Sequence, residues 1–427
     1  MWPIRKGLIA LGALDLTSQV GLSQIREGIK KENITDNYRF ALQEYNRFIR
    51  GMNQVLTPED LRTKLLASIL IICFESYLGD AKAVETQVRT SVRLLEEWKQ
   101  KLARPWFHPL SSPAPDVVED ELLHLFERLD LEVLSQHNPM SQEEHLLRKD
   151  SGIEAIAIMP KEFSSLGEAR MYGNLLHRRT THFLNAHDNK SSAALSIWDR
   201  VAGNVSPDAL HEFRQHRADF EVWYQAFEPI VRRSRISADM EEFRGVGIMR
   251  AHYLVLIMMF EQVLQPDELC FDAFHDDFVE MLDITKALLA VETSNFTLSA
   301  HSIVVLDCIA KKCRDSSIRW QAIRLLAERP RREAFWDSVM AAQICTWIVD
   351  VEEEGMVDGF VPEEARVRNI GARFDLERGE AEVWAYKLKE SGNFTDLIRR
   401  ETTIIWRTPS GSMACYGRQG AAALAEI

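Results

Sequence analysis

Apolar residues recur at intervals of three and four along most of this sequence, a spacing that places them on one face of successive α-helices. The clearest example spans residues 308–354. Its first apolar row comprises Ile318, Ala322 and Leu325, and its second comprises Phe335, Val339, Ala342, Cys345 and Val349. Pro330 lies between the rows and ends the first helix, because proline has no backbone N–H and restricts the residue before it. The segment predicts an αα-hairpin, with Asp315 or Ser316 capping its first helix.

Helix-start patterns mark further segments upstream. Ser165 with Glu168 fits a capping box, and Ser206-Pro207-Asp208 combines a cap, a first-turn proline and an acid. Thr57-Pro58-Glu59-Asp60 has the same form and precedes an apolar run over residues 65–77, which predicts a buried central helix. We therefore predict an all-α fold of many antiparallel helices in an α-solenoid-like body, although no fixed repeat period is present.

The order of these segments suggests a domain organisation. Residues 1–104 form an N-terminal helical part, and the proline-rich residues 105–116 form a possible linker. The main helical body covers residues 117–400 and includes a short helix that starts at Pro362. A C-terminal tail follows over residues 401–427, and its first residues, 402–407, are compatible with an extended strand.

The balance of charges argues against nucleic acid as a direct partner. The 427 residues include 51 Lys and Arg against 64 Asp and Glu, a formal net charge of −13. Because such a chain repels phosphate, we do not expect it to bind DNA by itself. Basic clusters at residues 232–235, 311–314 and 329–332 could contact phosphate or aid nuclear import, but helix-end cations and salt bridges are the simpler interpretation. The acidic runs 119–121 and 352–354 are interpreted as solvated faces.

Nothing in the hydropathy pattern indicates a membrane partner. A spanning helix needs about 20 apolar residues, and the longest candidate, residues 253–260, is better interpreted as part of a core helix. The N-terminus combines a basic start with a short apolar run. We interpret it as an amphipathic helix, with a signal peptide as the alternative.

The cysteines indicate neither a disulfide framework nor a metal site. Six are present, and the closest pair, Cys308 and Cys313, is separated by four residues. No C-x2-C pair occurs, so we interpret the two as small buried hydrophobic residues.

Other candidate chemistry is equally weak, and we predict no catalytic residue, metal or cofactor. His211 and His216 are five residues apart, whereas zinc-binding histidines on a helix are four apart, so we interpret them as part of a solvated helical face. His182 and His187 have the same spacing, and we expect them to run into a loop. The GxG at residues 245–247 has no third glycine and no preceding strand. His275-Asp276-Asp277 fits an acidic helix start better than a metal site.

Three blocks of the chain resemble the regulatory region of fungal binuclear zinc-cluster transcription factors. The first covers residues 41–46 and 69–75, the second is Phe163–Arg170, and the third lies in the predicted hairpin. Ala10-Leu-Gly-Ala-Leu14 also resembles the start of that region. The family-like positions of the third block are Cys313, Arg314, Asp315, Pro330, Arg331, Arg332, Trp336 and Asp337. These blocks are patterned helical stretches and carry no reactive group.

The resemblance implies a nuclear regulator of transcription that is not an enzyme. It would act through protein partners of the transcription machinery or a paralogous regulator, and a homodimer is a further option. The six closely spaced cysteines of the family's zinc cluster are missing, so DNA contact would need a partner or an upstream finger. Alternatives are a truncated gene model, a helical interaction protein without a link to DNA, and an enzyme of unknown reaction.

Overall fold

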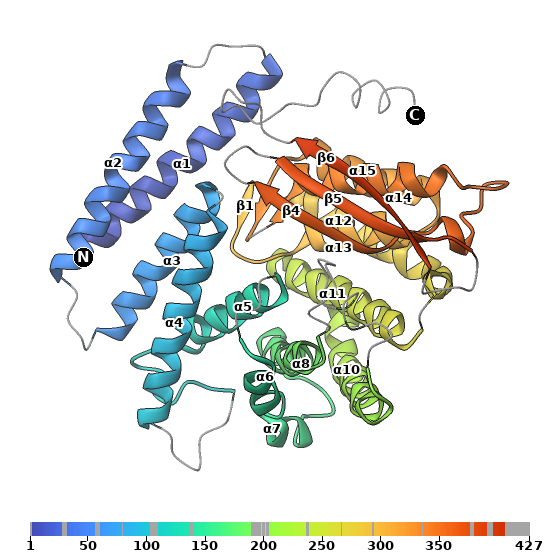
Figure 1. The fold of residues 1–427 in the computed structure, drawn as a ribbon. Coiled ribbons are helices and arrows are strands. Elements are labelled where there is room, and N and C mark those ends of the chain that lie inside the picture. Colours follow the sequence, from blue (N-terminus) through green and yellow to red (C-terminus); the bar gives the residue numbers. More distant parts are fainter. Residues whose placement is uncertain are drawn as a thin grey trace. The chain divides into compact units, whose positions relative to one another are not determined.

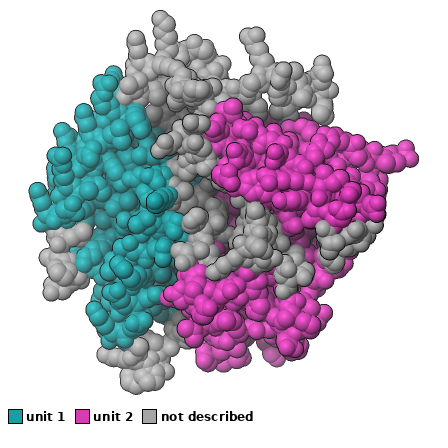
Figure 2. All heavy atoms as spheres, in the orientation of Figure 1, with its two compact units in different colours: residues 1–133, 294–299, 332–335 teal, residues 134–293, 300–331, 336–427 magenta. Residues whose placement is uncertain are grey.

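The computed structural model describes residues 2–27, 32–55, 60–78, 80–102, 110–136, 140–188, 198, 201, 205–235, 239–265, 267–292, 294–334, 336–375, 380–390 and 396–405. The chain divides into two compact units (Figure 2). Unit 1 contains residues 1–133, 294–299 and 332–335, and unit 2 contains residues 134–293, 300–331 and 336–427. Chain segments that are distant in sequence therefore build each unit.

Unit 1 consists of long helices with two short strands (Figure 1). Its elements are α1 (Trp2–Glu27), α2 (Glu32–Val55), α3 (Leu61–Leu78), α4 (Ala81–Leu102), most of α5 (Asp120–Gln136), β1 (Phe296–Thr297) and β2 (Arg332–Glu333). The two strands pair in parallel, with Phe296 opposite Arg332.

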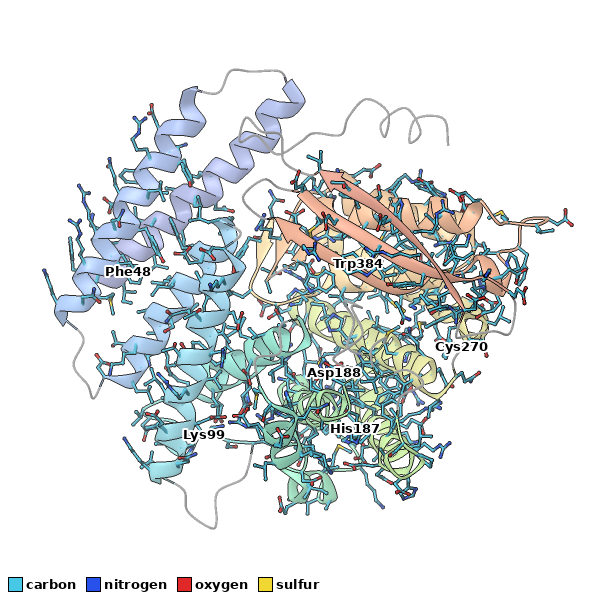
Figure 3. The ribbon with its side chains drawn as sticks, viewed as in Figure 1. Phe48, Lys99, His187, Asp188, Cys270 and Trp384 are labelled. Atoms are coloured by element: carbon cyan, nitrogen blue, oxygen red, sulfur yellow. The ribbon has the colours of Figure 1, made fainter. Side chains whose placement is uncertain are left out.

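Aromatic packing joins α2 to α3, the two helices that carry the first family-like block. Tyr45 stacks on Phe74 with ring centroids 3.8 Å apart, and its hydroxyl donates to the Glu75 carboxylate at 2.7 Å. Phe48 is fully buried in the same region (Figure 3). Gly7 of α1 allows close approach, because a Cβ there would lie 2.8 Å from the Cδ1 of Leu70.

Unit 2 contains the remaining helices and a small antiparallel sheet (Figure 1). Its elements are α6 (Gln142–Arg148), α7 (Ile153–Ala157), α8 (Leu166–Ala186), α10 (Pro207–Ser234), α11 (Met240–Leu264), η1 (Glu268–Phe274), α12 (His275–Val291), α13 (Ser302–Lys312), α14 (Ser316–Glu328), β3 (Trp336–Asp337), α15 (Ser338–Glu353), η2 (Glu363–Ala365), β4 (Arg368–Asp375), β5 (Glu380–Leu388) and β6 (Leu397–Ile405). One apolar core runs through α11 to α15. The prediction of a mostly helical fold is confirmed, while the domain boundaries given above stay a prediction.

The predicted hairpin is present as α14 and α15, which pack against one another. Asp315 caps α14 by accepting a hydrogen bond from the Ile318 backbone N–H at 3.0 Å. The start of the second helix was predicted too early. Arg332 and Glu333 lie in β2, and α15 begins at Ser338, because the Asp337 side chain caps it.

Two other predicted helix starts are also found. Ser206 accepts from the Ala209 N–H at 3.3 Å, and Ser165 accepts from the Glu168 N–H at 3.1 Å. The return bond of the expected capping box differs, since the Glu168 carboxylate accepts from the Ser164 N–H at 2.7 Å. The predicted cap at Thr57 lies outside the described residues.

The sheet of β4, β5 and β6 was not predicted as a unit, because its first two strands lie in the segment 117–400 that was expected to be helical. Only the extended residues 402–405 were anticipated, together with the short helix η2 after Pro362. In β5, Ala381, Val383 and Ala385 are buried at alternate positions against α15. Alternation over so few residues is a weak signal beside the long helical patterns around it.

One helix among the described residues, α11, is long and apolar enough to cross a membrane by length and composition. The same test is passed by core helices of soluble proteins. Ala251, Leu254 and Met258 of α11 belong to the unit 2 core, and the helix packs against α10, α12 and α13.

Candidate functional site

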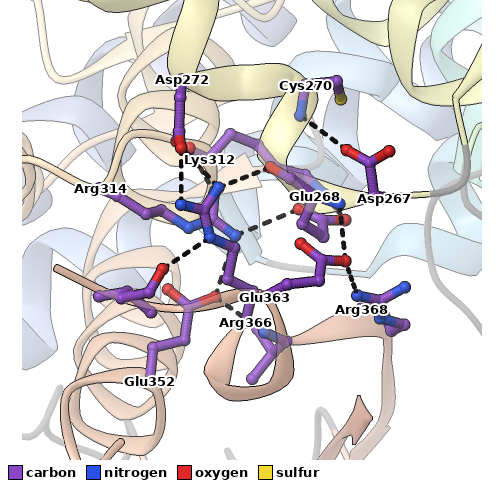
Figure 4. Close-up of polar contacts among 12 residues, drawn as sticks. Asp267, Glu268, Cys270, Asp272, Lys312, Arg314, Glu352, Glu363, Arg366 and Arg368 are labelled. Carbon is purple, nitrogen blue, oxygen red and sulfur yellow. Dashed lines mark hydrogen bonds and ion pairs between the residues drawn. The ribbon is translucent and has the colours of Figure 1, made fainter. Parts of the chain in front are cut away.

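A network of charged side chains, all buried except Asp272, lies where α13, α14 and α15 approach η1, η2 and β4 (Figure 4). Its carboxylates are Glu268, Asp272, Glu352 and Glu363, and its cations are Lys312, Arg314, Arg319, Arg366 and Arg368. All nine residues belong to unit 2. Burial of charges is costly unless they are paired, so this cluster is the most specific polar feature near the family-like positions.

Glu352 of α15 is the central carboxylate of the network and has no exposed surface. Arg319 Nη2 donates to its Oε2 at 2.6 Å, and Arg314 Nη2 donates to its Oε1 at 3.1 Å. The Val367 backbone N–H donates to Oε1 at 2.8 Å. Because these donors come from different parts of the chain, one carboxylate holds the hairpin to the segment that leads into β4.

Glu268 of η1 receives a second group of donors. Lys312 Nζ lies 3.0 and 3.2 Å from its two carboxylate oxygens, and Arg314 Nη2 lies 3.2 Å from Oε2. Burial raises the pKa of Glu268, but the charges of Lys312 and Arg314 outweigh burial and leave that pKa below its usual value. Burial likewise lowers the pKa of Arg314, and the charges of Glu352 and Glu268 reverse the effect and raise it. Both groups are therefore ionised at neutral pH.

Arg366 connects η1 to the start of the sheet. Its guanidinium makes a bidentate pair with Asp272 at 2.8 and 2.7 Å and donates to the Glu268 carbonyl at 2.8 Å. Glu363 Oε1 accepts from Arg368 Nη2 at 2.5 Å and from the Glu268 N–H at 3.1 Å. Planar bidentate pairs of this kind fix orientation as well as distance.

The structure brings some of the eight family-like positions together and gives them structural roles. Arg314 lies inside the network, while its neighbour Asp315 caps α14. Cys313 follows the end of α13 in the unit 2 core, and burial raises the pKa of its thiol to about 11. Cys308 is also buried, as the sequence indicated.

The remaining family-like positions lie around the connection between α14 and α15. Pro330 follows the end of α14. The Arg331 N–H donates to Ser338 Oγ at 2.9 Å, and Arg332 Nη1 donates to the Ser76 carbonyl at 3.0 Å inside unit 1. Trp336 packs against the unit 2 core, and Asp337 caps α15.

One member of the network contradicts its sequence interpretation. Residues 352–354 were expected to form a solvated acidic face, yet Glu352 is completely buried, because Arg314 and Arg319 approach it from the neighbouring helix and its preceding turn. Glu354 matches the expectation: it is exposed and pairs with Arg400. The sequence held a usable signal, since Glu352 is three residues beyond the apolar row position Val349.

The network can lock elements together, and the neighbouring thiol of Cys270 is poorly suited to chemistry. Burial, assisted by the charge of Glu268, raises the pKa of Cys270 to about 12, so this thiol is protonated near neutral pH. Among the residues that the structure describes, no group of three or more His, Cys, Asp or Glu side chains could hold a metal ion. We therefore interpret the network as a rigid support.

The three basic clusters are occupied by internal partners. Arg233 pairs with Glu242, and Lys311 pairs with Asp307 at 2.7 Å. Lys312 and Arg314 belong to the network. Arg331 Nη1 donates to the Arg329 carbonyl at 3.2 Å. The interpretation of these cations as salt-bridge and helix-end partners holds for the pairs named here.

The histidines differ from the sequence interpretation. His216 was assigned to a solvated face but is buried beside Thr180, because α10 turns it toward α8. His182 is also buried, with its Nδ1 2.7 Å from the Nδ1 of His145 in α6. Burial lowers the pKa of both His182 and His216 to about 3, helped by nearby positive charges. His187 follows the end of α8, with its ring 4.4 Å from that of Phe183 (Figure 3).

Two further sequence candidates are resolved by their positions. The GxG at residues 245–247 lies within α11 and not in a loop before a helix. His275 and Asp276 are exposed at the start of α12, in agreement with an acidic helix start.

Comparison with known proteins gives one partial match. Over 93 residues, covering 20% of this chain, the sequence is 38% identical to the aspercryptin biosynthesis cluster-specific transcription regulator of Emericella nidulans. The matched segment spans 15% of that regulator. No family model and no solved structure matches the chain. The match is similarity to a fungal transcription regulator over part of the chain.

Proposed function

We propose that this chain is a transcription-regulator-like protein of fungal type that acts through its helical effector region. Its site of action is the nucleus, and its role is regulatory and not enzymatic. The observation that carries the proposal is the 38% identity over 93 residues with a cluster-specific transcription regulator. The ordered family-like blocks support it, since the described residues of each block pack within unit 1 or unit 2.

The partners in this proposal are proteins: components of the transcription machinery, a paralogous regulator or a second copy of the chain. The net charge of −13 and the pairing of cations such as Arg233, Lys311 and Lys312 support this route. Phosphate affinity depends on cations that can release counterions, and cations already neutralised by carboxylates supply little. Contact with DNA would then be made by a partner or by a separate zinc finger.

A tethering experiment tests the regulatory role. The chain is fused to an unrelated DNA-binding domain in a fungal host, and a reporter controlled by that domain's site is measured. We expect the fusion to change reporter transcription relative to the domain alone. We expect Glu352→Gln to lose that effect, because it breaks the network, and Glu354→Gln, two positions further along the chain, to retain it. An abundant nuclear fusion that leaves the reporter unchanged contradicts the proposal.

A binding experiment tests the route to DNA. The purified chain is titrated against random and cluster-promoter DNA at several salt concentrations. We expect no binding at physiological salt. Tight binding with a steep salt dependence would instead identify a phosphate-contacting surface and would contradict the protein-mediated route.

A further inference from the structure

The strand β6 lies at an outer edge of the unit 2 sheet (Figure 1). The strand order is β4-β5-β6, so within the described part of the chain β6 pairs with β5 on one side and with no strand on the other. All nine residues of β6 follow the register of β5 without interruption. An outer strand of this kind presents a row of backbone N–H and C=O groups with which another strand can pair.

The backbone groups that point away from β5 belong to the odd-numbered residues of β6. Just before β6, the Lys389 N–H donates to the Asp396 carbonyl at 3.0 Å. Backbone groups alternate in direction along a strand, so the even-numbered residues over 396–404 bond to β5 and the odd-numbered residues point outward. The outward row therefore comprises Leu397, Arg399, Glu401, Thr403 and Ile405.

The opposite outer strand, β4, is less suited to receive another strand. Its register to β5 shifts between Arg368 and Gly371, and Asn369 between them has a positive φ of 51°. Such an irregularity bends a strand and interrupts its row of outward groups, which is one way in which proteins protect sheet edges. The nine residues of β6 contain no register shift, no proline and no glycine. Of the two edges, β6 is therefore the one suited to pairing.

The sequence of β6, Leu-Ile-Arg-Arg-Glu-Thr-Thr-Ile-Ile, has the same hydropathy pattern in both directions. Two aliphatic residues stand at each end, and the polar residues lie between them. An antiparallel pair of identical strands centred on Glu401 would place Ile398 opposite Ile404 and Leu397 opposite Ile405. Ile398 and Ile405 are 46% and 54% exposed, so such a pair covers aliphatic surface that is now in contact with water.

The charges in the middle of the strand also suit a symmetric pair. Glu401 would lie opposite its own copy, and two carboxylates in that position repel each other. Each is already paired with Arg399 of the same strand at 3.0 Å, and the Arg399 of the second copy would lie diagonally across from it. Arg400 lies on the other face of the strand and pairs with Glu354 of α15 at 2.8 Å. A pair centred on Arg400 would bring two arginines face to face, so the centre at Glu401 is favoured.

We propose that two copies of this chain associate through β6, antiparallel and centred on Glu401, and thereby join their three-stranded sheets into one continuous sheet. The outward N–H and C=O groups of the odd-numbered residues form the hydrogen bonds, and Ile398 and Ile405 provide apolar contacts. A contact along nine residues is small for a protein interface, so we expect a dissociation constant in the micromolar range. The inference rests on the proposed protein-mediated route and selects the second copy as the partner.

Analytical ultracentrifugation of the purified full-length chain, at concentrations from about 1 to about 100 μM, measures the association. Thr403→Pro removes an N–H that points outward and leaves the bonds to β5 in place, since proline is tolerated at such edge positions. Ile398→Lys puts a charge opposite Ile404 of the second copy. The matched control is Ile158→Lys, which makes the same change at an exposed isoleucine outside the sheet. Circular dichroism checks that each variant is folded.

A crosslink tests the register. Opposite Cα atoms of a hydrogen-bonded antiparallel pair are about 5.5 Å apart, so Glu401→Cys brings two thiols together across the symmetric contact. Glu382→Cys on the central strand β5 would lie about 20 Å from its copy. We expect a short bismaleimide to join two Glu401→Cys chains more efficiently than two Glu382→Cys chains or two unaltered chains. Equal crosslinking of the two variants overturns the pairing about Glu401.

We expect the unaltered chain and Ile158→Lys to reach the mass of two chains at the upper concentrations, and both β6 variants to associate at least about tenfold more weakly. A chain that stays monomeric at about 100 μM overturns the inference, and so does undiminished association of folded Ile398→Lys, which decides the matter if Thr403→Pro folds poorly. The tethering experiment remains separate. A monomeric chain that still changes the reporter overturns the pairing alone, whereas a dimeric chain that leaves the reporter unchanged contradicts the regulatory role while the pairing stands.

Discussion

Two sets of arginines in unit 2 differ in how their charge is compensated. In the ion network, Arg319 and Arg366 are fully buried and each donates to a carboxylate. On α8, burial alone lowers the pKa of Arg170, and no carboxylate contributes to that shift. Because an arginine is always charged, the first arrangement stabilises a fixed geometry and the second carries an uncompensated desolvation cost.

This difference separates charged side chains that are paired and hold elements of the fold together from a charged side chain that is not paired with a carboxylate. The network carries a family-like residue, Arg314, and its partners come from the same chain. Its charges are paired, although Arg314 Nε, Arg319 Nη1 and Glu363 Oε2 are buried without a hydrogen-bond partner. On α8, Arg170 is the last residue of another family-like block, and no carboxylate contributes to its pKa shift. Position in a family-like block therefore does not by itself indicate whether a residue acts in folding or in binding.

The largest expected effect comes from breaking the network at its most buried pair. Arg319→Met should lower the free energy of unfolding by about 3–5 kcal/mol, because Glu352 then loses its closest donor while it stays buried. Urea unfolding followed by circular dichroism measures the change.

Glu354→Gln is the matched control, since this exposed carboxylate pairs with the surface arginine Arg400, and it should leave the midpoint unchanged. If Arg319→Met unfolds at the same urea concentration as the unaltered chain, the network is not the support described here.

The contributions of the network and of the buried histidines to stability should be lost over different pH ranges. The folded pKa of His182 and His216, about 3, lies below the usual value of 6.5, so the stability tied to their neutral forms is present above pH 6.5 and falls as pH drops toward 3. The pKa of Glu268 is lowered from 4.5, so its contribution is lost only below that pH. Between pH 6.5 and 4.5 the histidines therefore act before the network.

His216→Phe should flatten the fall in stability between pH 6.5 and 4.5 by up to about 1 kcal/mol per pH unit. The ring replaces imidazole beside Phe183, whose centroid lies 5.1 Å away. Unfolding midpoints at several pH values measure the slope. His211→Gln, an exposed change on the same helix, is the control, and an equal slope in all three proteins argues against the histidine effect.

Local patterns predicted the parts of this fold that depend on local physics. The rows of Ile318 and Val339 predicted two helices, and aspartates at positions 315 and 337 cap them, although only the first was anticipated. A cap needs only a side chain and the amides within three residues. The strand β5 was missed because its hydrogen bonds are completed by the separate strands β4 and β6, which no local pattern reveals.

The candidate sites depend on partners that no local pattern identifies. Glu352 is buried because Arg319, 33 residues away, reaches it, and the acidic run around it suggested exposure. The state of Arg170 depends on the lack of a carboxylate near it in three dimensions. Neither the presence of the first partner nor the lack of the second could be deduced from spacing along the chain.

A smaller effect should follow from removing a cap outside the network. The Asp337 carboxylate accepts from the Val339 and Met340 N–H groups at 3.0 and 3.1 Å. Asp337→Ala should cost about 1 kcal/mol, and Asp337→Asn should retain most of the stability, since an amide oxygen can accept the same bonds. Equal loss in both variants, measured by urea unfolding, would show that the charge and not the cap matters.

The smallest expected effect has the opposite sign and is the sharpest test of the comparison. Arg170→Met should raise the free energy of unfolding by about 1 kcal/mol or less, because it removes a desolvated charge that has no counter-ion and leaves an apolar chain of similar length. The same substitution at Arg319 destabilises the protein, so the two variants should move the urea midpoint in opposite directions. If Arg170→Met instead destabilises the chain, Arg170 has a structural role like that of Arg319, and the distinction between an arginine paired with a carboxylate and one without a counter-ion fails. If it stabilises the chain, the unaltered protein carries an avoidable desolvation cost at α8.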